Sequence, residues 1–349
     1  MVDDTEQGAT GTHGGAGAEP ESAGVAGAAG ADASWLALMI ARVTLRLSRY
    51  PVRRWIGGPM RRRLEATGGY PFNVRTADGV TLAAWYAPAT PATPATPGDD
   101  GDAPAGSGGG GGRGGGGGAL PVVMAHGWLE VKEFHVSHIR TLNRAGHDVI
   151  TFDHRAHGRS TGRVGTFGVR ERHDLAAVID AGVERGLIRD RVISVGFSLG
   201  AATALQHAPD DDRVAGVIAY APFVDLAAAI RSFREMLAPW IDDRWLAAGF
   251  ERAAAEADFD IAQADTLAAM RRLTQPVLMI EGGRDRNLPP RWHTHKLAEA
   301  KTQGSLEVMT IEQATHCGLC RRANWPGLNA AIRRFCVSAG CEADSGEAP

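Results

Sequence analysis

The segment Gly196-Phe197-Ser198-Leu199-Gly200 has the residue types and spacing of an activated serine. A β-branched run at 191–195 precedes it and small residues at 201–206 follow it, which predicts a strand that turns directly into a helix. Glycines two positions before and after the serine leave room for a strained turn that exposes the hydroxyl. The segment therefore predicts that Ser198 is the nucleophile of a serine hydrolase.

The same G-x-S-x-G pattern occurs a second time, at Gly158-Arg159-Ser160-Thr161-Gly162. This match lies in a polar stretch several residues after its strand, and residues 163–168 behind it have no helical periodicity. A nucleophile elbow needs a strand immediately before the serine and a helix immediately after it. We therefore predict that Ser160 is not the nucleophile.

A serine hydroxyl is a weak nucleophile until a nearby base takes its proton. Three histidines lie well downstream of Ser198, namely His293, His295 and His316. The first two fall in a polar helix start, where we expect solvated side chains. His316 follows the last predicted strand, at the sheet edge where the reactive groups of parallel sheets gather. His316 is therefore the predicted base.

The base works best when a carboxylate fixes its tautomer, so an acid is needed as well. Asp285 lies in the tight loop 281–289 that follows the apolar strand 276–280, on the same side of the sheet as the serine. Asp225, one strand earlier, is the alternative, although it could instead cap the helix that starts at Leu226. We predict that Asp285 is the acid.

Acyl transfer also requires two N–H donors that stabilise the oxyanion. One is expected from the residue after the nucleophile, which is Leu199, and the other from the loop after the first parallel strand. In that loop, His126-Gly127-Trp128, the amide of Trp128 is the predicted donor. His126 precedes the serine in the chain and is expected to order the loop.

Apolar strands alternate with helices along the chain, behind an N-terminal hairpin. The predicted hairpin pairs residues 72–76 with 80–86. Further strands are predicted at 121–125, 148–152, 191–195, 214–220, 276–280 and 306–311. The main helices between them are predicted at 136–145, 170–185, 292–301 and 327–337. Strands that are apolar on both faces imply a mainly parallel sheet covered by helices on both sides, so the predicted fold class is α/β.

Composition separates a folded part from segments that cannot build a core. Residues 1–33 and the Pro-, Thr- and Gly-rich residues 89–119 contain few large apolar side chains, so both are predicted to be disordered. The remaining residues suffice for one α/β domain. The net charge of −3 gives no reason to expect a nucleic-acid partner.

Residues 34–66 are predicted to form a basic amphipathic helical segment. Apolar side chains alternate there with Arg42, Arg46, Arg49, Arg53, Arg54, Arg61, Arg62 and Arg63. The apolar run is too short to span a bilayer, and no small-residue cleavage site follows it. Two alternatives remain: a helix docked on the core, or contact of residues 34–63 with a membrane surface or a partner. We expect a cytoplasmic protein, peripherally membrane-associated under the second alternative.

The four cysteines, Cys317, Cys320, Cys336 and Cys341, all lie near the C-terminus. Their spacing, C-x2-C-x15-C-x4-C, lacks the second C-x2-C of a zinc ribbon. Reduced thiols are the favoured interpretation, with a metal site or a disulfide as alternatives. We predict no cofactor and no resident metal.

Taken together, these segments resemble a bacterial α/β-hydrolase of the serine-hydrolase type, similar to esterases and serine aminopeptidases. The resemblance rests on the loop 126–128, the D-x-R-x-H-G-x-S loop at 153–160, the elbow 196–200, the loop 282–285 and His316. The resemblance implies a structural role for the second loop, which accounts for the repeated pattern at Ser160, and Ala156 stands where that loop usually has glycine. The resemblance implies an α/β-hydrolase domain over residues 67–338, interrupted by the insert 89–119 and followed by a tail at 339–349. It also implies a helical cap at 226–273 that roofs the serine.

The apolar and aromatic residues of the predicted cap indicate an uncharged, partly apolar small-molecule ester or thioester as substrate. The expected mechanism is two-step acyl transfer on Ser198, His316 and Asp285. Peptidase or acyltransferase activity is an alternative, because the same three residues serve both. A non-catalytic binding protein that keeps the fold is an alternative of another class.

Overall fold

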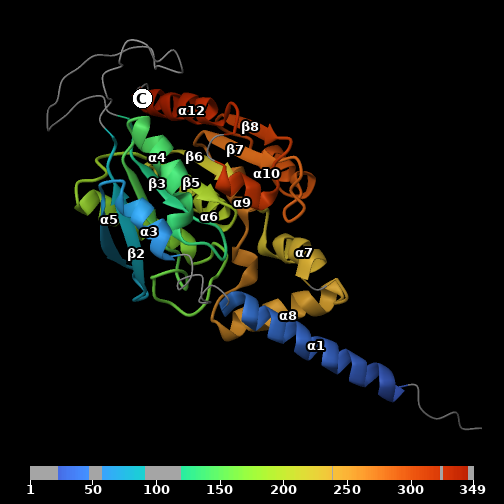
Figure 1. The fold of residues 1–349 in the computed structure, drawn as a ribbon. Coiled ribbons are helices and arrows are strands. Elements are labelled where there is room, and N and C mark those ends of the chain that lie inside the picture. Colours follow the sequence, from blue (N-terminus) through green and yellow to red (C-terminus); the bar gives the residue numbers. More distant parts are fainter. Residues whose placement is uncertain (1–22, 47–56, 91–118, 238, 323–324, 345–349) are drawn as a thin grey trace, which may run out of the picture.

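The computed structural model describes residues 23–46, 57–90, 119–237, 239–322 and 325–344, which build a sheet covered by helices (Figure 1). Its eight strands follow the order β1-β2-β4-β3-β5-β6-β7-β8. They are β1 (Tyr70–Arg75), β2 (Thr81–Ala87), β3 (Val122–Ala125), β4 (Val149–Phe152), β5 (Val192–Phe197), β6 (Val214–Tyr220), β7 (Val277–Gly282) and β8 (Leu306–Ile311). The strand order places β5, which leads to the predicted nucleophile, near the middle of the sheet.

The predicted fold class is confirmed. Strands β1 and β2 form an antiparallel hairpin whose turn contains Gly79, at φ 82°, a conformation that glycine adopts without strain. Strand β2 pairs antiparallel with β4, and every pair from β4 onward is parallel. Parallel strands all end at the same edge, so the loops after β3, β5, β7 and β8 can converge there.

Alternate residues of each central strand face opposite helical layers. In β3, Val122 and Met124 belong to one apolar cluster and Val123 and Ala125 to the other. The first face is covered by α3 (Gly57–Glu65), α4 (Val136–Arg144), α11 (His316–Arg321) and α12 (Leu328–Asp344). The second is covered by α5 (Glu171–Glu184), α6 (Leu199–His207), α9 (Thr266–Arg272) and α10 (Thr294–Ala300). Burial on both faces explains why these strands read as continuous apolar runs.

A third apolar cluster lies outside these two layers and joins α1 (Ala23–Arg46), α7 (Leu226–Leu237) and α8 (Asp243–Glu256). Figure 1 shows α1 lying alongside α8, away from the sheet. The two backbones come close: a Cβ atom on Gly249 would lie 2.7 Å from the carbonyl carbon of Ala37. The cluster also includes Leu199, the first residue of α6, so this layer reaches the elbow.

Short 3-10 helices complete the connections: η2 (Lys132–His135), η3 (Ala208–Asp210), η4 (Ile261–Gln263) and η5 (Pro290–Trp292). The insert 226–273 is helical as predicted, but only part of it joins the third cluster. Its last helix, α9, packs through Met270 against the sheet layer that contains α6.

Two terminal boundaries differ from the predictions. Helix α1 begins at Ala23, inside the stretch 1–33 predicted to be disordered, because alanine-rich sequence favours a helix even without large side chains. Helix α12 continues to Asp344, past the predicted start of the tail at 339. Residues 1–22, 91–118 and 345–349 of the predicted low-complexity segments and tail lie outside the described residues.

The segment 34–66 is helical at both ends, in α1 and α3, with residues 47–56 outside the described part. Side chains Ala37, Leu38, Ala41 and Leu45 of α1 are buried in the third cluster, which corresponds to the docked-helix alternative. Among the described residues, no helix combines the length and the apolar character needed to cross a bilayer.

Candidate active site

Ser198 lies at a tight turn between β5 and α6. Its backbone adopts φ 50° and ψ −106°, a conformation that costs a non-glycine residue about 1–3 kcal/mol. The flanking glycines are required by close approach: a Cβ atom on Gly196 would lie 2.2 Å from the Gly200 carbonyl oxygen. A Cβ atom on Gly200 would lie 2.2 Å from the carbonyl oxygen of Ala125. The turn therefore has the geometry of a nucleophile elbow.

Ser198, His316 and Asp285 form a continuous hydrogen-bonded chain. The Ser198 Oγ is 3.0 Å from Nε2 of His316, and Nδ1 of His316 is 2.7 Å from Oδ2 of Asp285. A carboxylate only accepts, so Nδ1 carries the proton and Nε2 is left to accept from the serine hydroxyl. An imidazole in this arrangement can accept a proton from a serine hydroxyl.

Each partner of the serine is held by the element that follows its strand. Asp285 lies in the turn after β7, where its Oδ1 accepts from the backbone N–H groups of Asn287 (2.9 Å) and Leu288 (2.8 Å). His316 is the first residue of α11, which follows β8. The Oγ1 of Thr315 caps that helix by accepting from the N–H of Gly318. The sequence prediction placed His316 on a loop and missed this short helix.

The rejected candidates lie in other surroundings. Asp225 accepts from the backbone N–H of Ala228 at 2.6 Å and so caps α7. Helix capping is the alternative to a catalytic role that the sequence analysis gave for this residue. His295 is exposed and lies 3.3 Å from Glu281. The prediction that His293 is solvated was wrong: the ring is buried, with Nε2 3.0 Å from the hydroxyl of Ser232 in α7. Burial lowers the pKa of His293 to about 4.

Ser160 ties two backbone segments together. Its hydroxyl donates to the carbonyl of Asp153 at 2.5 Å and accepts from the N–H of Ala83 in β2 at 2.9 Å. The Asp153 carboxylate is engaged by the buried ammonium of Lys132 at 2.7 Å. These contacts connect β2 with the loop after β4 and fit the predicted structural role.

The loop after β3 contains the second predicted oxyanion donor, the amide of Trp128. The preceding carbonyl, of Gly127, accepts from Nδ1 of His126 at 2.7 Å and from the N–H of Glu130 at 3.2 Å. The Gly127 carbonyl and the Trp128 N–H belong to one planar trans peptide, so fixing the carbonyl also fixes the direction of the N–H. The Nε2 of His126 accepts from the N–H of His154 at 3.0 Å, which assigns the proton to Nδ1.

Buried imidazoles surround this loop. The rings of His126 and His154 meet edge to face at 4.7 Å, and His157 packs on His126 at 5.2 Å. Burial, reinforced by these neighbouring histidines, holds the pKa of His126 well below its usual range. The pKa of His154 is lowered to about 4, again mainly by burial. These rings are therefore neutral at pH 7 and support the loop as packed, hydrogen-bonded groups.

The sequence analysis did not single out Glu130 and His135, which also lie beside this loop. The Oε2 of Glu130 is 2.9 Å from the Gly127 N–H nitrogen and 2.9 Å from Nε2 of His135. In the sequence, the signal for Glu130 was its position three residues after Gly127, in the loop predicted to supply an oxyanion donor. No sequence rule pairs it with a histidine five residues later.

The cysteines whose side chains the structure describes are free thiols. Cys317, Cys320 and Cys336 are free. Burial raises the pKa of Cys317, which disfavours its thiolate. Within the ranges that the structure describes, no group of three or more His, Cys, Asp or Glu side chains is arranged to hold a metal ion. The side chain of Cys341 is not among those that the structure describes.

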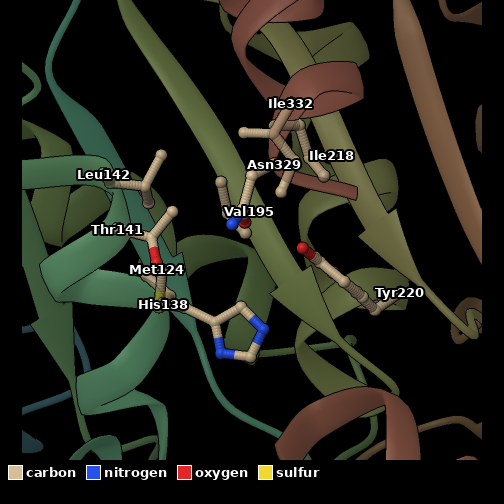
Figure 2. Close-up of a pocket in the computed structure, with 9 residues that line it drawn as sticks. All are labelled: Met124, His138, Thr141, Leu142, Val195, Ile218, Tyr220, Asn329 and Ile332. Carbon is tan, nitrogen blue, oxygen red and sulfur yellow. The ribbon is translucent and has the colours of Figure 1, made fainter. Parts of the chain in front are cut away.

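A small cavity lies between the sheet and helices α4 and α12, inside the first apolar layer (Figure 2). Residues of β3, β5 and β6 line it together with His138 and Asn329. Neither ring nitrogen of His138 has a hydrogen-bond partner among the described residues, and burial lowers its pKa to about 3. Ser198 is not among the lining residues, so this cavity is separate from the serine site.

Comparisons with known proteins agree with this geometry. The family model described as alpha/beta hydrolase family matches residues 122–320, more than half of the chain. Among proteins with curated descriptions, none matches this sequence.

Solved structures share the fold at low sequence identity. An esterase from Pyrococcus furiosus is 19% identical, with a TM-score of 0.58, 78% of this chain and 93% of that chain covered. A puromycin-hydrolyzing peptidase from Mycobacterium tuberculosis is 20% identical, with a TM-score of 0.53 and coverage of 78% and 39%. A hypothetical protein from Pseudomonas aeruginosa is 16% identical, with a TM-score of 0.53 and coverage of 78% and 93%. With its matched family model and this fold, the chain belongs to the alpha/beta hydrolase family.

Proposed function

We propose that this hydrolase cleaves an uncharged, partly apolar carboxylic ester or thioester through an acyl-enzyme on Ser198. The observation that carries the proposal is the hydrogen-bonded chain from Ser198 through His316 to Asp285. Esterase neighbours such as the Pyrococcus furiosus enzyme support the reaction class at the level of the fold.

In the proposed first step, Ser198 Oγ attacks the carbonyl carbon while its proton moves to Nε2 of His316. Asp285 holds the imidazolium that forms, and the amides of Leu199 and Trp128 stabilise the oxyanion. The tetrahedral intermediate collapses, and His316 gives its proton to the departing alcohol or thiol. Water then attacks the acyl-enzyme, with His316 as the base, and the acid leaves as Ser198 regains its proton.

The apolar substrate class rests on the third cluster. Leu199 is buried in it together with Phe223 and Leu288, and Trp128 packs against it. Helices α7 and α8 contribute the large side chains Ile230, Leu246 and Phe250 to the same cluster. We propose that these two helices, with α1, are the cap that roofs the serine, which favours an apolar acyl or alcohol group over a charged one.

A fluorophosphonate probe tests the nucleophile, and p-nitrophenyl esters test the substrate class. Wild-type protein should be labelled and Ser198→Ala should not. Across acetate, butyrate, octanoate and a succinate monoester, kcat/KM should rise with apolar chain length and be lowest for the charged acid. Efficient cleavage of aminoacyl p-nitroanilides with negligible ester turnover would favour the peptidase alternative. Absence of both labelling and turnover would favour the non-catalytic alternative.

A further inference from the structure

A partly buried carboxylate, that of Glu130, lies in the sharp turn between β3 and η2, next to the predicted oxyanion loop, with 20% of its side chain exposed. The Oε2 atom of Glu130 accepts two hydrogen bonds, from the Gly127 N–H and from Nε2 of His135, both at 2.9 Å. The His135 side chain has no exposed surface, and its other ring nitrogen has no hydrogen-bond partner among the described residues. Glu130 is therefore the group that orients this ring.

The other side of His135 contacts the elbow. Its ring stacks on Phe197, with centroids 3.9 Å apart and planes 20° from parallel. Phe197 is the last residue of β5 and directly precedes Ser198. Glu130 and His135 thus join the loop that contains one predicted oxyanion amide to the strand that presents the nucleophile.

The space around Gly127 is too small for a side chain. A Cβ atom on this glycine would lie 2.9 Å from Oε2 of Glu130 and 3.4 Å from the carbonyl oxygen of Phe197. The Glu130 backbone N–H donates to the Gly127 carbonyl while its side chain accepts from the Gly127 N–H. Glu130 therefore holds both peptides that flank Gly127, including the one that contains the Trp128 N–H.

The groups around Glu130 favour its ionised form. Burial acts to raise its pKa, but His135, the Gly127 N–H and the more distant His316 outweigh burial, and the pKa is lowered. A carboxylate accepts from both donors at once without a proton of its own. The Glu130 carboxylate is thus an anion that accepts from two donors, the Gly127 N–H and Nε2 of His135.

We infer that Glu130 and His135 are positioning residues that hold the Trp128 amide at the distance from Ser198 that the oxyanion requires. The inference rests on the proposed function. Their contribution grows as negative charge develops on the substrate oxygen, so it should affect kcat more than KM.

Near-isosteric variants separate hydrogen-bond reach from charge. Glu130→Gln keeps an oxygen that can accept from Gly127 and His135, so kcat for p-nitrophenyl butyrate should stay within about threefold of wild type. Glu130→Asp keeps the charge but is one methylene shorter, so kcat should fall about tenfold or more. This loss should be smaller than the roughly 10²–10³-fold fall in kcat that follows removal of an oxyanion donor. KM should change less than twofold in both variants.

Glu133→Gln is the matched control, because Glu133 is also mostly buried but contacts Lys132 and not the loop. Rates are to be normalised to sites titrated with the fluorophosphonate, so that unfolded protein does not lower kcat. The Ki of a boronic acid that mimics the tetrahedral intermediate should rise in Glu130→Asp in proportion to the loss of kcat/KM.

Wild-type kcat in Glu130→Asp, or an equal loss of kcat in Glu130→Gln and Glu130→Asp, would overturn the inference. So would a loss expressed only in KM. Failure of the proposed function would look different: wild-type protein would neither titrate with the probe nor turn over the ester.

Discussion

The two G-x-S-x-G segments share a pattern and use it for different physical reasons. At the elbow, the serine takes the left-handed backbone, at φ 50°, and its glycines provide clearance for crossing backbone. At the second segment, the glycines and not the serine have positive φ, 48° at Gly158 and 103° at Gly162, and a Cβ atom on Gly158 would also lie 2.3 Å from the carboxyl carbon of Asp153. The comparison teaches that the chemistry of a serine is set by the groups its hydroxyl meets. One hydroxyl meets an imidazole, whereas the other meets only backbone.

The largest effect is expected from removing the two hydroxyls in turn. Ser198→Ala should lower kcat for p-nitrophenyl butyrate by at least about 10⁴-fold, because no other group can form the acyl-enzyme. Ser160→Ala should leave kcat near wild type but lower the free energy of unfolding by about 1–3 kcal/mol, because the Ala83 N–H loses its acceptor. Steady-state kinetics and urea unfolding check both. Similar kinetic losses in the two variants would remove the distinction.

The two candidate acids give the next largest contrast. Asp285→Asn should lower kcat by roughly 10³–10⁴-fold, because the amide can no longer hold the Nδ1–H tautomer of His316. Asp225→Asn should leave kcat within about twofold, because an asparagine also caps a helix. The measurement is kcat at pH 8 for both variants. A larger loss in Asp225→Asn would reassign the acid.

The segment around Ser160 should control acid stability. The folded pKa of His154 is about 4, below the usual 6.5, so its neutral form is favoured by folding. This contribution is fully present above pH 6.5 and is lost as pH falls from 6.5 toward 4, at ~1.4 kcal/mol per pH unit. His154→Gln should therefore flatten the dependence of Tm on pH between 6.5 and 4.5. A wild-type slope in this variant would show that other groups cause the acid sensitivity.

The smallest effect concerns α1. Trp35, Met39 and Val43 lie at four-residue intervals on its outer face and are exposed, whereas the inner face packs on α8. Contact of residues 34–63 with an anionic membrane stays a prediction. Replacing the three side chains with serine should lower co-sedimentation with phosphatidylglycerol vesicles about twofold or more. Trp240→Ser, an exposed tryptophan outside α1, is the control. Equal sedimentation of all forms would remove the membrane hypothesis.

Local patterns were sufficient for most of the sheet and for the strand, turn and helix around Ser198. The run 191–195 and the small residues after Gly200 fixed the elbow, and the apolar strands were recognisable because both of their faces are buried. His316 and Asp285 could be placed because parallel strands end at one edge, so position along the chain implies position in space.

The features that the sequence did not predict depend on long-range contacts. His293 was misassigned because its burial depends on Ser232 in α7, far away in the chain. The pairing of Glu130 with His135 depends on the turn after β3, which no short pattern specifies. The start of α1 was missed because alanine and glycine both lack a large apolar side chain, so a prediction from composition treats them alike. The two residues nevertheless differ in helix propensity.

The close crossing of α1 and α8 at Gly249 has a practical consequence for anyone who produces this protein. A shortened form that begins at residue 67, where the hydrolase domain was predicted to start, would lack α1. Leu246 and Phe250 would then lose the α1 side chains that pack on them in the third cluster. The hydrogen bond from the Gly165 N–H to the Leu45 carbonyl would also be lost. Such a form would expose apolar surface next to the elbow and should aggregate or precipitate during purification. The leading helix is best treated as an integral part of the enzyme.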